Sequence, residues 1–145
     1  MTIPIITSIT AGILLVFQQL LGITVGMRRV STVRGVGYGE DVILERMIRR
    51  HGNLAENAAI FLVVLGLLEV IGVAGGVVMA FAGLFLVARA SHAIGFSFLK
   101  GSHGGEFQEG GRAAVLMRSA GAMITVLTGM AAGSFLTYFA FSQLG

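Results

Sequence analysis

The sequence predicts an all-α integral membrane protein, a bundle of four transmembrane helices. Of its 145 residues 55% are hydrophobic and only 12% are charged, and the mean hydropathy is +0.89. A soluble domain usually carries about 25% charged residues, and a core of this size could not hide so many apolar side chains. The apolar residues also form four long runs, and most of the charges lie in the short stretches that flank them.

The four runs span about residues 3–27, 43–71, 73–99 and 113–141. Each is long enough to cross a ~30 Å hydrocarbon core, which takes roughly 20 helical residues. The first run lacks a positively charged start and is too long for a signal peptide, so we expect it to be retained. The glycine turn 72-GVAGG-76 predicts a helical hairpin, and 100-KGSHGGEFQEGGR-112 is the other clear loop. We expect the four spans to form one domain.

The basic residues predict the orientation in the membrane. All but Arg89 lie at or between the ends of the first and second runs, or at the junction of the third and fourth: Arg28, Arg29, Arg34, Arg46, Arg49, Arg50, Lys100, Arg112 and Arg118. An even number of spans puts these two regions on the same side, and neither terminus carries Lys or Arg. The positive-inside rule therefore predicts cytoplasmic charged loops and external termini.

Several classes of protein and site are excluded or disfavoured. The chain has no Cys, which excludes disulfides and Cys-based metal or nucleophile sites. Its three His residues lack metal-ligand spacing, so no metal is expected, and His103 in the glycine-rich loop is expected to be solvated. No basic face rich in aromatic residues is present, which argues against nucleic acid as a partner.

The second run begins with a polar arc. At 100° per residue, Glu45, Arg49, Asn53 and Glu56 fall within about 80° of one another. Glu56 lies 13 residues before Glu69, which is near the far end of the helix, and this separation corresponds to about 20 Å. Glu56 would then sit roughly 10 Å inside a ~30 Å core. Ionisable groups at that depth are candidates for a functional site.

The third run carries a matching feature in 89-RASHAIGF-96. Arg89, His92 and Phe96 share one face, and Arg89 is expected near the level of Glu56. A buried cation and anion at one depth should pair or share a polar ligand. Two interpretations stay open: an internal salt-bridge network, or a site for a small ligand with carboxylates and amines, since arginine binds carboxylates with two hydrogen bonds.

Other polar and small residues are expected to serve helix packing. Gln18 and Gln19 could form hydrogen bonds between helices. In the fourth run, small residues recur at four-residue spacing and predict a close helix contact: Gly121, Thr125, Gly129 and Gly133.

The pattern 46-R..R.HGN..E-56 resembles the signature of the MAPEG family, the membrane-associated proteins in eicosanoid and glutathione metabolism. The motif 89-R..H..GF-96 and the pair Arg118–Ser119 match as well, so the resemblance covers essentially the whole chain. The HGN form is most similar to the bacterial branch, which implies a bacterial inner membrane. The resemblance implies a homotrimer that binds glutathione between helices 1 and 2 of one chain and helices 3 and 4 of its neighbour. The glutathione-binding positions that it implies are Arg28, Arg49, His51, Asn53, Glu56, Arg89 and His92.

The resemblance also implies a reaction. An unperturbed thiol has a pKa of about 8.5, and an adjacent guanidinium favours the nucleophilic thiolate. Arg118 is expected to activate the glutathione thiol, with Ser119 as a hydrogen-bond donor and Arg112 as the alternative to Arg118. The thiolate would attack a lipophilic electrophile that arrives from the membrane lipid, so both a transferase and a peroxidase activity fit.

The chain departs from the family pattern at three positions. Asn57 stands where many members have Tyr, Ala59 replaces a frequent Pro, and Phe96 replaces a pocket Tyr. These changes keep open a non-catalytic MAPEG-fold protein that binds a lipid or a small anionic ligand. A transporter is disfavoured, because the charges gather near one boundary and a pathway needs polar groups at the midplane.

Overall fold

The protein is a bundle of four long helices. The structure, a computed structural model, describes residues 3–98 and 111–144, and Lys100 and His103 lie outside these residues. The helices are α1 (Ile5–Ser31), α2 (Val42–Val70), α3 (Gly75–Ser97) and α4 (Arg112–Ser142). All four are long and apolar enough to cross a membrane. The predicted all-α membrane fold with four spans is therefore confirmed.

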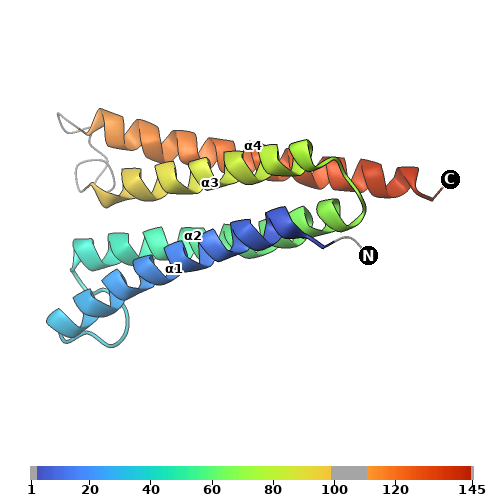
Figure 1. Cartoon of the computed structure of the whole chain (residues 1–145). Coiled ribbons are helices and arrows are strands. Elements are labelled where there is room, and N and C mark those ends of the chain that lie inside the picture. The colour runs from blue at the N-terminus through green and yellow to red at the C-terminus, as the bar shows by residue number, and fades with distance from the viewer. Residues whose placement is uncertain (1–2, 99–110, 145) are drawn as a thin grey trace.

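The helices run up and down in two pairs, α1 with α2 and α3 with α4 (Figure 1). The 32–41 loop, the end of α3 and the start of α4 lie at one end of the bundle, which is also its wider end, and both termini lie at the other. Between the pairs lies an apolar core that includes a stacked pair of rings, Phe61 and Phe85, with centroids 3.8 Å apart. The helix ends that flank the two charged regions thus lie at the same end of the bundle, as the number of spans requires.

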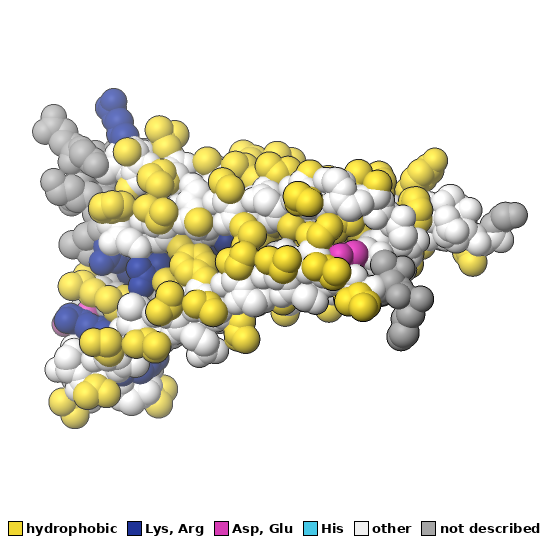
Figure 2. All heavy atoms as spheres, in the orientation of Figure 1, with side chains coloured by type: hydrophobic (Ala, Val, Ile, Leu, Met, Phe, Trp, Pro, Cys, Tyr) yellow, Lys and Arg dark blue, Asp and Glu magenta, His cyan; other side chains and the backbone are white. Residues whose placement is uncertain are grey.

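The outer surface of the bundle is apolar along most of its length. Figure 2 shows hydrophobic side chains covering the visible face, with Lys and Arg gathered at the loop end. Large apolar side chains project outward from every helix, among them Leu15, Val63, Leu84 and Val126. Such a band suits contact with lipid chains, which are as apolar as these side chains.

Helix α1 extends one turn beyond the apolar run that predicted it. The run ends near residue 27, whereas the helix continues to Ser31 and has Arg28 and Arg29 in its last turn. Arginine forms helices readily, and cations are stabilised near a helix C-terminus by the helix dipole. Hydropathy marked the end of the span, whereas the helix itself continues past it.

The turn between α2 and α3 is built on one glycine. Gly72 has a φ of +88°, which places it in the left-handed region that favours glycine. Its N–H donates to Glu69 O (3.2 Å) and the N–H of Val73 donates to Leu68 O (3.0 Å). This is a Schellman motif, in which two otherwise unpaired helix carbonyls are satisfied. Gly75 and Gly76, also expected in the turn, already belong to the first turn of α3.

Helices α3 and α4 make the most extensive contact in the bundle. A Cβ on Gly95 would lie 2.5 Å from Arg118 N, and one on Gly121 would lie 2.6 Å from Ala88 O. The packing face predicted on α4 is correct for Gly121 and Thr125 but not, within one chain, for Gly129 and Gly133, whose added Cβ would meet nothing within 4 Å. Four-residue steps rotate by about 40° each and so turn out of the contact, whereas the buried face mixes steps of three and four.

Candidate functional site

A polar groove runs along the start of α2. It has a volume of about 310 Å³ and is lined by Tyr38, Glu45, Ile48, Arg49, Gly52, Asn53 and Glu56. The predicted polar arc therefore forms a concave site. By helical geometry the arc lies about 150° around α2 from the buried stripe that contains Leu54 and Leu65. The groove thus faces away from the chain's own core.

The groups in the groove carry both signs of charge. The Arg49 side chain is 65% exposed, and its Nη2 lies 3.7 Å from Glu45 Oε1, a loose contact. The Asn53 amide donates to Arg49 O (3.0 Å), and Glu56 is exposed. A guanidinium can bind a carboxylate, and a carboxylate can bind an ammonium group. The arrangement therefore suits a small ligand that carries both.

Arg89 does not pair with Glu56, so the direct pair, one of the two arrangements expected from their depth, is wrong. Arg89 is 3% exposed, and its Nη1 donates to Thr125 Oγ1 of α4 over 3.3 Å. Its Nε is buried and has no hydrogen-bond partner among the residues that the structure describes. Depth along the helices placed Arg89 and Glu56 at one level, but the rotation of α2 turns Glu56 outward while Arg89 points inward.

A second cluster lies at the loop end of the α3–α4 contact. The His92 and Phe96 rings are 5.1 Å apart, and the Arg118 guanidinium carbon lies 5.1 Å from the centre of the Phe96 ring. This is cation–π geometry. His92 is buried and Arg118 is half-buried, whereas Ser119 and Arg112 are exposed. None of these residues lines the α2 groove.

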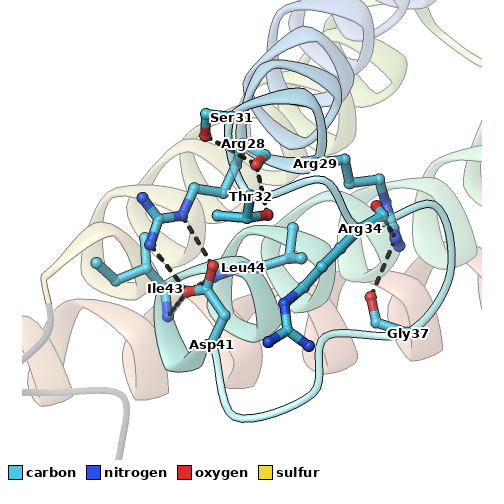
Figure 3. A network of polar contacts seen from close by, with 9 residues as sticks. All are labelled: Arg28, Arg29, Ser31, Thr32, Arg34, Gly37, Asp41, Ile43 and Leu44. Carbon is cyan, nitrogen blue, oxygen red and sulfur yellow. Dashed lines mark hydrogen bonds and ion pairs between the residues drawn. The ribbon is translucent and has the colours of Figure 1, made fainter.

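Two further expected ligands are engaged within the chain. Arg28 donates through Nε and Nη2 to the Asp41 carboxylate (2.9 and 3.1 Å; Figure 3). This bond and the Leu44 N–H hold the pKa of Asp41 below its usual value. The side chain of His51 faces α1, where its Nε2 lies 2.7 Å from the Gln18 amide nitrogen.

The hydrogen bond that was expected between helices is confirmed for Gln18. Gln19, the other glutamine expected in such a bond, is exposed.

Sequence reasoning missed two residues with clear positions. Arg50 joins three helices, because it donates to Ser97 Oγ of α3 (2.6 Å) and Thr24 Oγ1 of α1 (2.9 Å). Tyr38 comes from the 32–41 loop and lines the groove. Its one sequence signal is its position between two glycines in 35-GVGYGED-41, close before the arginine-rich start of α2.

Across residues 3–98 and 111–144, no cluster of three or more His, Asp or Glu could hold a metal ion.

Comparison with known proteins gives one match. The model of the MAPEG family matches residues 7–136. The match starts in the first turn of α1 and ends within α4, so it includes the whole groove as well as Arg89, His92 and Arg118. No curated protein and no solved structure was found to match the chain.

Proposed function

The chain belongs to the MAPEG family, and on this basis we propose that it is a membrane-embedded, glutathione-dependent transferase or peroxidase that acts on lipophilic electrophiles. The observation that carries the proposal is the groove of Arg49, Asn53 and Glu56 on the outward face of a membrane helix. Charged groups in that position are costly in lipid. A function or a covering partner must therefore account for them.

Glutathione fits the chemistry of the groove. It carries two carboxylates, one ammonium group and a thiol, and the groove offers a guanidinium, an amide and two carboxylates from Arg49, Asn53, Glu45 and Glu56. Its volume of about 310 Å³ is at the lower end of small-molecule pockets, which measure roughly 300–1,000 Å³. A second wall is needed to enclose the ligand.

We propose that a neighbouring copy in a homotrimer supplies that wall. The groove on α2 faces outward, and Arg118 on α4 does not line it. The two parts of the expected site are separate within one chain, and a second copy that packs its α4 against the groove would bring them together. Repetition of the same contact around a three-fold axis closes a ring and covers the charged face of α2 in each subunit.

In this arrangement Arg118 activates the thiol. Its positive charge stabilises the thiolate and lowers the thiol pKa. The contact with Phe96 holds the guanidinium in one place, so little ordering remains when glutathione binds. A lipophilic electrophile reaches the thiolate laterally from the bilayer. The polar cosubstrate enters at the loop end, which the positive-inside rule assigns to the cytoplasm.

The test is a titration of purified protein with glutathione, followed by ultraviolet absorbance of the thiolate. We expect a thiolate signal in wild-type protein, its loss in Arg118→Ala and its retention in Arg112→Ala. Absence of both binding and thiolate in wild-type protein would overturn the enzyme proposal. Loss only in Arg112→Ala would transfer the activating role to Arg112.

A non-catalytic MAPEG-fold protein that binds a lipid or a small anion is the second candidate. It is favoured by Asn57 and Phe96, which bring no hydroxyl to a ligand. The Asn57 amide donates to Asn53 O (2.8 Å), and the Phe96 ring is occupied by His92 and Arg118. This candidate predicts that glutathione, if it binds, keeps its thiol protonated.

A further inference from the structure

Tyr38 is the single contribution of the 32–41 loop to the groove, and every other lining residue in the described part of the chain belongs to α2. Tyr38 lines the groove and is 42% exposed as a residue. The phenol hydroxyl can both donate and accept a hydrogen bond. Tyr38 therefore adds a neutral polar group to a groove whose other polar side chains are three charged groups and one amide.

The backbone around Tyr38 is held in a defined shape. Gly37 and Gly39 have φ values of +69° and +57°, so the chain turns sharply on either side of the tyrosine. Arg29 Nη1 donates to the carbonyl oxygens of Gly35 (3.1 Å) and Gly37 (3.0 Å). Figure 3 shows Arg29 beside the loop, together with Arg28 and Arg34. These contacts hold the backbone of the loop next to Tyr38 against the end of α1.

Asp41 connects the backbone of Tyr38 to the start of α2. Its N–H donates to Tyr38 O (3.0 Å), and its carboxylate accepts from the N–H groups of Ile43 and Leu44 and from Arg28. The Arg28–Asp41 ion pair is therefore linked to Tyr38 through one backbone hydrogen bond.

We propose that Tyr38 is a binding residue of this groove: its hydroxyl hydrogen-bonds a polar group of bound glutathione and its ring covers the ligand. Arg28 and Asp41 act as positioning residues through the Tyr38 backbone. This inference rests on the proposed function. The competing interpretation is an interfacial anchor, since Tyr is common at membrane boundaries. An anchor would be indifferent to the ligand.

The composition of the chain allows a direct optical test. It contains no Trp and two Tyr, and the second, Tyr138, is exposed near the C-terminal end of α4. In Tyr138→Phe all tyrosine fluorescence comes from Tyr38, and in Tyr38→Phe all of it comes from Tyr138. We expect glutathione to change the emission of the first variant and not of the second. An unchanged Tyr38 signal at saturating glutathione would overturn the contact.

Calorimetry tests the energetics in the full-length protein. Loss of one neutral hydrogen bond should raise the Kd for glutathione in Tyr38→Phe by about 2- to 12-fold. Asp41→Asn keeps a helix-capping oxygen but loses the charge that pairs with Arg28. It should raise the Kd in the wild-type background and have little further effect in Tyr38→Phe, because coupled residues are not additive. Equal effects in both backgrounds would refute the positioning role.

The outcomes separate the two proposals. If wild-type protein binds glutathione and Tyr38→Phe binds it equally well, Tyr38 is an anchor and the proposed function stands. If wild-type protein binds no glutathione, the proposed function and the role of Tyr38 both fail.

Discussion

Glu69, in the last turn of α2, caps the start of α1 through Thr7. One carboxylate oxygen, Oε2, accepts from both the N–H and the hydroxyl of Thr7 (2.8 Å each). The other, Oε1, accepts from Ile6 N (2.8 Å). The residue before α1 is Pro4, whose side chain cannot cap a helix. Glu69 is an acidic residue in the otherwise apolar outer half of α2. Its presence is explained by the N–H groups at the start of α1, which lack partners within that helix, and by the dipole of α1.

We predict that Glu69→Ala lowers the free energy of unfolding by about 1–3 kcal/mol, because it leaves N–H donors of α1 without acceptors. Thermal unfolding in detergent measures the change. Thr7→Val is the matched control: it removes one hydroxyl but keeps the N–H bond to Glu69, so its effect should be smaller. An equal loss in both variants would contradict the capping role.

The contact between α3 and α4 should not tolerate a methyl group at its closest points. We predict that Gly95→Ala and Gly121→Ala each destabilise the protein by about 1–3 kcal/mol or more, because the new Cβ would meet backbone atoms of the facing helix. Gly83→Ala, also in α3, is the control, since a Cβ there meets nothing within 4 Å. It should be neutral or slightly stabilising, because alanine favours helix. The unfolding temperatures of the three variants decide the point.

Acid should loosen the 32–41 loop through Asp41. Its folded pKa lies below the unfolded value because Arg28 and the Leu44 N–H favour the carboxylate. A depressed pKa contributes stability that is fully present above the unfolded pKa of about 3.9 and is lost as the pH falls through the folded pKa. We expect the unfolding temperature of wild-type protein to fall in that acid range more than that of Asp41→Asn. Identical pH profiles would show that Asp41 contributes nothing.

A site shared between subunits should be restored by mixing two inactive variants. Arg49→Ala damages the groove on α2, and Arg118→Ala removes the proposed activating group on α4. In randomly mixed trimers about one quarter of the interfaces combine an intact groove from one subunit with an intact Arg118 from the next. Glutathione-dependent activity should therefore reappear on co-expression. No recovery in trimers shown to be mixed would place the whole site within one chain.

Periodicity predicted correctly which residues of α2 lie together. Arg49, Asn53 and Glu56 share one arc in the sequence and one groove in the structure. Depth was a weaker guide: it gave Arg89 and Glu56 a common level but could not give the direction in which each helix turns its side chains. The place of Tyr38 in the groove could not be derived from its position between two glycines, because it depends on the path of a loop that contacts Arg28 and Arg29.

The sequence by itself determined the four spans, the shared end of the charged loops and the polar arc on α2. These follow from local rules, since a hydrophobic run and a 100° repeat act within one segment. Only the tertiary structure decided that Arg28 pairs with Asp41, that Glu69 caps α1 and that the arc faces away from the core. Each of these depends on how separate helices rotate and cross. That rotation is set by packing between helices, as at Gly95 and Gly121, where the backbones of α3 and α4 come into close contact.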